Sequence, residues 1–330
     1  MRRPLIVLPL ASLLLAAVVI PVSCGDGRPR RPSSSAEVVP QGADALNALV
    51  ASYDLAADRP QRFMVGLVTN DQQLVSFGEA RLSFAYLGEG QGAPPPEPGP
   101  EAIAAWQPIP GQDLTEVPDA PRVVSGSEGT GVYAARDVTF ARPGFWQVDV
   151  AVEVDGQTKR AEAAFQVHPE PVIVAPGDAA PPSENHLPGA QGVPVKAVDS
   201  RAEPDGTVPD PELHQLTVAE ALASGKPTMV VVSTPVYCVS RFCGPITDAV
   251  QELARRHGGA MNFVHIEVWK DFEAKILNEA AADWIYPPGA EDAVEPWVWV
   301  VGADGVVTER FDNVASEAEL AAAVEAAIGT

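Results

Sequence analysis

Basic residues are scarce in this sequence relative to acidic ones. The chain of 330 residues has 22 lysines and arginines against 44 aspartates and glutamates, which gives a formal net charge of −22. An acidic surface of this kind repels the phosphates of nucleic acids. We therefore expect no nucleic-acid partner. Several basic residues lie near the N-terminus, so the rest of the chain is more acidic still: Arg2, Arg3, Arg28, Arg30 and Arg31.

Long hydrophobic runs are missing after the start of the chain. The one such run covers residues 5–22 behind two arginines, the layout of a signal peptide, which we predict for residues 1–24. The sequence Val22-Ser23-Cys24-Gly25 resembles the lipobox of bacterial lipoproteins, although Pro21 stands where leucine is usual. The resemblance implies that Cys24 is lipidated and anchors the protein in the cell envelope, outside the cytoplasmic membrane. Two alternatives stay open: ordinary cleavage of the signal, and a retained membrane helix, because about 18 apolar residues approach the length of a span.

Cysteine is also scarce, with three residues in the whole chain. If Cys24 carries lipid, Cys238 and Cys243 are the two that remain. An even pair of thiols in an exported protein favours a disulfide.

Alternation of apolar and polar residues with period two dominates residues 55–168. The clearest example runs from Trp146 to Val154, and Asp155-Gly156 then supplies a tight turn, so we predict a hairpin. About seven short strands in this length are typical of an immunoglobulin-like sandwich. Residues that resemble the last strands of such domains in bacterial envelope proteins are Gly131-Val132-Tyr133 and Pro143-Gly144-Phe145-Trp146. With neither cysteine nor histidine before its last residue, this part is predicted to be a spacer or docking module.

Two segments lack hydrophobic periodicity. Residues 25–54 begin with a run rich in proline, serine and charge and are predicted to be a flexible tether. Residues 169–211 hold many prolines and are predicted to be an interdomain linker.

Helix and strand signals alternate from residue 212 to the end of the chain. Capping boxes at Thr217–Glu220 and Ser316–Glu319 predict helix starts, and Thr228 to Ser233 is a continuous apolar strand. Further expected elements are a helix after Cys243 that stops near Gly258, a strand at 261–268, a helix at 272–284, and strands at 297–301 and 306–311. This order predicts an α/β domain.

Two landmarks in residues 212–330 resemble the thioredoxin-like superfamily. Tyr237-Cys238 follows an apolar strand and precedes a helix, and Glu295-Pro296-Trp297 precedes a later strand. The resemblance implies a C-terminal α/β thioredoxin-like fold, with Pro296 as a cis-proline beside the cysteines. It further implies that Cys238 is the attacking thiolate at a helix N-terminus and that Cys243 resolves the mixed disulfide.

Other residues of this predicted site have supporting roles. Arg241 lies between the cysteines and would add positive potential. The strand at Thr228–Ser233 lacks the buried carboxylate of thioredoxins, and Glu267 and Glu295 are possible substitutes. Because Cys243-Gly244-Pro245 resembles the start of the thioredoxin motif, Cys243 is the alternative nucleophile.

The cysteine spacing departs from that of thioredoxins, with four residues between the cysteines instead of two. In a regular helix the Cα atoms of Cys238 and Cys243 would lie roughly 8 to 9 Å apart, beyond the reach of a disulfide. Either Cys238 lies in a loop before the helix, or the first helical turn unwinds on oxidation. Some peroxiredoxins share this spacing, but they carry threonine at the position of Pro235. A copper site of the cytochrome-oxidase assembly type is weakly supported, because no histidine follows Pro296.

The sequence thus predicts an envelope thiol–disulfide oxidoreductase that acts through Cys238 and Cys243, without cofactor or metal. Its expected partners are exported proteins or a redox partner protein. Two alternatives stay open: a non-enzymatic envelope protein for binding or assembly, whose disulfide only stabilises the fold, and a peroxiredoxin-like peroxidase.

Overall fold

The computed structural model describes residues 46–90, 95–112, 114, 117–125, 129–286 and 294–329. All of them belong to one compact unit, Ser34–Thr330. The predicted signal peptide, with Cys24, lies outside the described residues.

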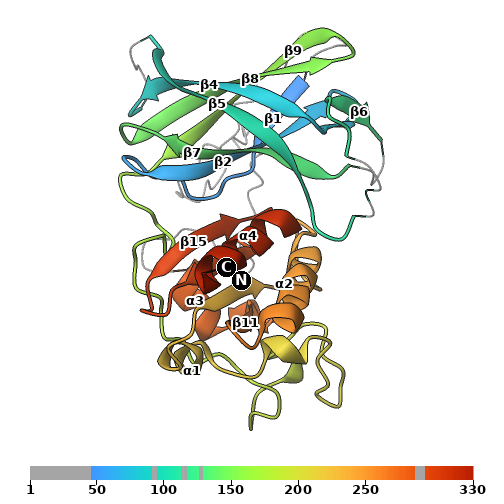
Figure 1. The fold of residues 1–330 in the computed structure, drawn as a ribbon, viewed down its shortest axis with the longest axis vertical. Helices are drawn as coiled ribbons and strands as arrows, with labels where there is room; N and C mark the ends of the chain where they lie inside the picture. Colours follow the sequence, from blue (N-terminus) through green and yellow to red (C-terminus); the bar gives the residue numbers. More distant parts are fainter. Residues whose placement is uncertain are drawn as a thin grey trace, which may run out of the picture. The chain divides into compact units, whose positions relative to one another are not determined.

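One antiparallel sheet organises the N-terminal part of this unit (Figure 1). In the described residues its nine strands are β1 (Leu46–Val50), β2 (Pro60–Thr69), β3 (Leu74–Ser76), β4 (Glu79–Gly88), β5 (Glu97–Pro108), β6 (Arg122–Val124), β7 (Gly131–Thr139), β8 (Gly144–Val154) and β9 (Gln157–Val167). Their order is β6-β3-β2-β7-β5-β4-β8-β9, with β1 paired to β2. Since β1 also contacts β9, the sheet curls around one core, in which Phe63, Phe84, Phe140 and Phe165 meet.

The predicted hairpin of this region is confirmed. β8 and β9 pair from Gly144↔Val167 to Val154↔Gln157. Asp155 and Gly156 both have positive φ, at 53° and 73°, as a two-residue turn of this type requires. The sheet also begins before the predicted boundary at residue 55, because β1 lies within the segment expected to be a tether.

The C-terminal part is built on a four-stranded sheet with the order β11-β10-β14-β15. Its strands are β10 (Thr228–Ser233), β11 (Asn262–Glu267), β14 (Trp297–Val301) and β15 (Val307–Asp312), and a short separate hairpin comprises β12 (Trp269–Asp271) and β13 (Ile276–Leu277). Its helices are α1 (Val218–Ala223), α2 (Cys243–His257), α3 (Glu279–Ile285) and α4 (Glu317–Ile328). The structure has both predicted capping boxes, at the starts of α1 and α4.

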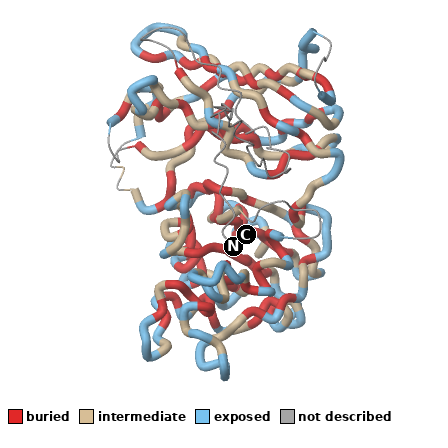
Figure 2. Tube along the Cα trace, turned by 180° about the vertical axis from the view of Figure 1, so that it is seen from behind, coloured by how far each residue is buried: buried red, intermediate tan, exposed pale blue. Residues whose placement is uncertain are grey.

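Period-two alternation divides the side chains of this sheet between its two faces. Met229 and Val231 of β10 share a core with α2 and α4, and Val230 and Val232 share another with α1 and α3. The segment predicted to be a linker, 169–211, contributes Ile173 and Ala180 to the second core, and its buried stretches are visible in Figure 2. It carries two short 3₁₀ helices, η1 (Val195–Ala197) and, where it ends, η2 (Pro211–Leu213).

The predicted fold class is wrong. Strands make up 40% of the structure and helices 17%. The N-terminal strands follow one hydrogen-bonded path, not the two separate sheets of an immunoglobulin-like sandwich. In the C-terminal sheet only β10 and β11 are parallel among the described strands, so an α/β thioredoxin-like fold is not established. Apolar patterns identify strands, whereas partners and directions depend on contacts distant in sequence.

The helix predicted at 272–284 is also only partly correct. Its first half is taken up by a turn, in which Lys275 has a φ of 56°, and by the two-residue strand β13. The Asn278 side chain accepts a hydrogen bond from Ala280 N and caps α3, so the helix begins at Glu279.

Candidate functional site

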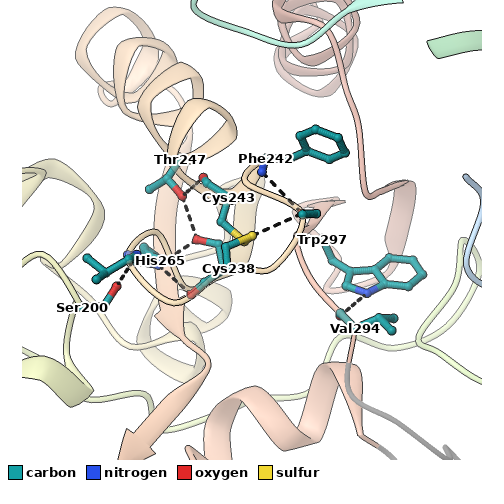
Figure 3. Close-up of a disulfide and its surroundings, with 11 residues drawn as sticks. Ser200, Cys238, Phe242, Cys243, Thr247, His265, Val294 and Trp297 are labelled. Carbon is teal, nitrogen blue, oxygen red and sulfur yellow. Dashed lines mark hydrogen bonds between the residues drawn. A yellow bond between two sulfur atoms is a disulfide. The ribbon is translucent and has the colours of Figure 1, made fainter. Parts of the chain in front are cut away.

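A disulfide between Cys238 and Cys243 marks the loop that joins β10 to α2 (Figure 3). The two Cα atoms are 6.1 Å apart, within the usual range for a disulfide. Phe242 is the N-cap and α2 begins at Cys243, so Cys238 lies in the loop before the helix. This is the first of the two expected geometries. It also means that Cys243, and not Cys238, occupies the helix N-terminus.

The two cysteines differ in exposure. Cys243 is fully buried, whereas Cys238 is half-buried. Beside Cys238, Val239 is 92% exposed and Val236 is 56% exposed. Of the two cysteines, Cys238 is therefore the more accessible.

Polar contacts and ring stacking hold the loop in place. The Ser240 Oγ lies 3.3 Å from Cys238 Sγ and accepts a hydrogen bond from Phe242 N. The ring of Tyr237 stacks on Phe272 with centroids 4.0 Å apart. Val236 N donates to Ser200 Oγ at 3.1 Å, which ties the loop to the segment predicted to be a linker.

A chain of hydrogen bonds leads from Cys243 into the sheet. Thr247 Oγ1 donates to the Cys243 carbonyl at 2.8 Å, and Ser233 Oγ lies 2.7 Å from Thr247 Oγ1. His265 Nε2 on β11 lies 3.0 Å from Ser233 Oγ, and Figure 3 shows Thr247 and His265 on one side of the disulfide. Sequence reasoning missed Ser200, Ser233 and Thr247. Of these, Thr247 alone carried a signal, since it lies one helical turn after Cys243.

The predicted residues Glu295 and Pro296 lie beside the cysteines. The Glu295–Pro296 peptide bond is cis. A carboxylate oxygen of Glu295 and the two sulfurs all lie within 4.8 Å of one another. Burial, with a smaller contribution from the charge of Glu267, raises the pKa of Glu295 to about 7. This carboxyl group can therefore take up or release a proton near neutral pH.

Glu267, the other predicted carboxylate, is buried at the end of β11. It accepts hydrogen bonds from Ser200 N at 2.8 Å and from Trp269 N at 3.2 Å. Burial raises the pKa of Glu267. Because one of these donors is the backbone N of Ser200, Glu267 holds the chain at Ser200 against the end of β11.

Arg241 lies in the same loop with its side chain exposed. Its φ of 65° is unusual for a residue with a side chain. Within the described part of the chain, its guanidinium makes no ion pair. Cys238, Cys243 and Glu295 together form a possible three-ligand metal group, but a closed disulfide offers no thiolate, so only the reduced form could bind an ion there.

Across residues 46–329, with the gaps given above, the structure contains no helix long and apolar enough to cross a membrane.

Comparisons with known proteins add no family to this picture. No protein-family model matches the chain, and none of the curated proteins compared with it matches.

Proposed function

We propose that this protein carries out thiol–disulfide exchange with exported proteins through Cys238 and Cys243. The observation that carries the proposal is the asymmetric disulfide: one sulfur belongs to an accessible loop residue, the other to a buried residue at a helix start. Such a pair separates attack on a partner from resolution of the mixed disulfide.

In the reduced protein, the Cys238 thiolate attacks one sulfur of a partner disulfide. A Cys238–partner disulfide forms, and the other partner sulfur leaves as a thiolate. Cys243 then loses its proton and attacks the Cys238 sulfur, which closes the internal disulfide and releases the second partner thiolate. The partner gains two electrons, and the two protons lost by the cysteines end on its thiols. The reverse sequence oxidises a partner dithiol.

Glu295 is the group we assign to the proton of Cys243. Its carboxylate lies within 4.8 Å of both sulfurs, and its pKa of about 7 suits proton transfer near neutral pH. The dipole of the 15-residue helix α2 would further stabilise a thiolate at Cys243.

The cell envelope is the proposed location. Cys24 would carry the lipid anchor, and an oxidising compartment would maintain the disulfide. The exposed apolar residues Val236 and Val239 suit contact with the polypeptide of a partner.

The test is to trap the mixed disulfide. In Cys243→Ser the resolving thiol is lost, so we expect Cys238 to remain bonded to partner proteins, seen as bands on a non-reducing gel that a reductant removes. The matched variant Cys238→Ser should trap few or none, because Cys243 is buried. If neither variant traps a partner from an envelope extract, the proposal is wrong.

A structural disulfide is the competing function, favoured by the complete burial of Cys243. The reduction potential of the pair separates the two. A value below about −300 mV, with no activity on an unfolded disulfide substrate, would support the structural role.

A further inference from the structure

A second group of polar side chains gathers behind the disulfide, inside the C-terminal part of the chain. Asp199, Asp210 and His214 come from the segment before α1, and His265 comes from β11. All four side chains are completely shielded from solvent. Buried charged or imidazole groups are costly unless they are paired or bind an ion.

The distances within this group match the edges of a tetrahedron. A metal ion with bonds of about 2.0 to 2.2 Å to four ligands separates the ligand atoms by about 3.3 to 3.6 Å. His214 Nε2 lies 3.2 Å from Asp210 Oδ1, 3.6 Å from Asp199 Oδ2 and 3.4 Å from His265 Nδ1. His265 Nδ1 lies 3.5 Å from Asp199 Oδ2 and 3.7 Å from Asp210 Oδ2. With Asp210 Oδ1 as the fourth ligand atom, four of the six edges are therefore already close to the required length, while the distance from His265 is to the other oxygen, Asp210 Oδ2.

The outer nitrogen of His265 fixes which nitrogen faces the group. His265 Nε2 lies 3.3 Å from the Ser233 carbonyl oxygen and 3.0 Å from Ser233 Oγ. A carbonyl only accepts hydrogen bonds, so Nε2 carries a proton, and in the neutral ring Nδ1 then presents its lone pair to the group. Metal-binding histidines are commonly oriented by such a hydrogen bond from the other nitrogen.

One carboxylate oxygen in the group lacks a hydrogen bond. Asp210 Oδ1 is buried, and among the described residues no donor satisfies it, although His214 Nε2 is only 3.2 Å away. A buried carboxylate oxygen without a donor is unfavourable. A cation at the centre of the four ligands would satisfy it.

Arg201 orients the two carboxylates from outside. Its Nη2 donates to Asp199 Oδ2 at 2.9 Å and to Asp210 Oδ2 at 2.6 Å, and its Nε donates to Asp199 Oδ1. One guanidinium neutralises only one of the two carboxylates, so the second is balanced either by a protonated His214, which lies against both, or by a bound cation.

We propose that Asp199, Asp210, His214 and His265 bind one divalent transition-metal ion, zinc by preference. Two nitrogens and two oxygens in a tetrahedral arrangement suit Zn²⁺. With four protein ligands and no access to solvent, the site is structural. It would fix the 199–214 segment to β11, and through Ser200 it would support the loop that carries Cys238. This inference is independent of thiol exchange.

Metal binding to the oxidised protein tests the site, because a closed disulfide removes both thiolates from competition. After treatment with a chelator, the full-length protein is dialysed against Zn²⁺ or Co²⁺ and its metal content is measured. We expect one ion per chain and, with Co²⁺, the strong visible absorption of tetrahedral coordination without a sulfur-to-cobalt band. No stoichiometric binding, or the weak spectrum of octahedral cobalt, would overturn the proposal and leave an ion-pair network with Arg201 only.

Variants locate the ion. Asp210→Asn keeps the shape of the side chain and His265→Gln keeps a polar group, and each should abolish stoichiometric binding. Ser233→Ala removes the hydroxyl contacts to His265 Nε2 and Thr247 but keeps the carbonyl contact to His265 Nε2, and should weaken binding by roughly 10-fold. His257→Ala, at the end of α2, is the matched control and should bind as the wild type does. Unchanged binding in the first two variants would also overturn the assignment, and the wild-type cobalt spectrum decides the question if they do not fold.

Discussion

At the residue scale, the surroundings of Glu295 beside the disulfide disfavour its charged form. Burial and the charge of Glu267 both favour its protonated form, and its pKa is raised to about 7. Burial, and to a smaller extent the charges of Asp312 and Glu295, raise the pKa of Tyr53, whose backbone N donates a hydrogen bond to Asp312 Oδ2 at 2.6 Å. No cation is among the groups that shift the pKa of Glu295, so its charged form is weakly supported.

Replacement Glu295→Gln should therefore change the pH dependence of both stability and exchange. Because the folded-state pKa lies above that of the unfolded chain, Glu295 favours folding below about pH 4.5, and this contribution is lost as the pH rises through 7. The variant should match the wild type at pH 4 and exceed its free energy of unfolding at pH 8 by about 1 to 3 kcal/mol. The exchange rate should lose its inflection near pH 7.

Urea denaturation between pH 4 and pH 8 measures the change in stability. The change in exchange rate is measured as the reduction of an unfolded disulfide substrate over the pH range where the protein is active. Glu273→Gln, at an exposed position in the turn before β13, is the control and should follow the wild type. Parallel pH profiles for Glu295→Gln and the wild type would remove Glu295 from the proposed mechanism.

At the scale of elements, the loop between β10 and α2 depends on the disulfide. The two cysteines that it joins are only five positions apart in the sequence. By the chain-entropy estimate, closing so short a ring contributes about 2 kcal/mol. Inside this ring, Arg241 has a positive φ, a backbone conformation that is unfavourable for a residue with a side chain. We expect the backbone at Arg241 to leave this conformation once the disulfide opens.

Reduction should loosen this loop and leave the body of α2 intact. We expect amide hydrogen exchange in residues 236–242 to rise by roughly 30-fold, the factor that corresponds to about 2 kcal/mol. Amides of Val250 to Ala254, which pack against the sheet, should not change. The double variant Cys238→Ser/Cys243→Ser should behave like the reduced protein. Equal exchange in the oxidised and reduced forms would show that the loop is held by its other contacts.

Elements and site residues with local signals were predictable from the sequence, and those that depend on distant contacts were not. The hairpin at Asp155-Gly156 and the capping boxes rest on adjacent residues. The disulfide was expected from the even pair of thiols, and the cis bond at Pro296 from the resemblance of residues 295–297 to thioredoxins. Strand direction in both sheets, and the burial of the segment expected to be a linker, depend on packing between residues far apart in sequence. Polar residues in that segment gave no periodic signal, so Ser200 was missed.

At the scale of the whole compact unit, a buried ion pair connects the N-terminal sheet to α4. Arg62 of β2 donates from Nε to Glu319 Oε1 at 3.0 Å and from Nη2 to Glu319 Oε2 at 2.8 Å. The side chains are 9% and 6% exposed. Arg62 Nη1 also donates to the Val314 carbonyl at 2.6 Å. A paired, two-pronged contact of this kind is oriented more strictly than an exposed ion pair.

Loss of this pair should destabilise the whole unit. Glu319→Gln keeps an acceptor for the capping hydrogen bond from Ser316 N but removes the charge that faces Arg62. Removing the carboxylate that pairs with the buried Arg62, and with Arg136 at 3.4 Å, should lower the free energy of unfolding by about 3 kcal/mol. Asp149→Asn is the control: its partner Arg160 is 65% exposed, so we expect a loss below about 1 kcal/mol. Urea denaturation monitored by tryptophan fluorescence measures both. Equal losses in the two variants would mean that the Arg62–Glu319 pair does not stabilise the contact between sheet and helix.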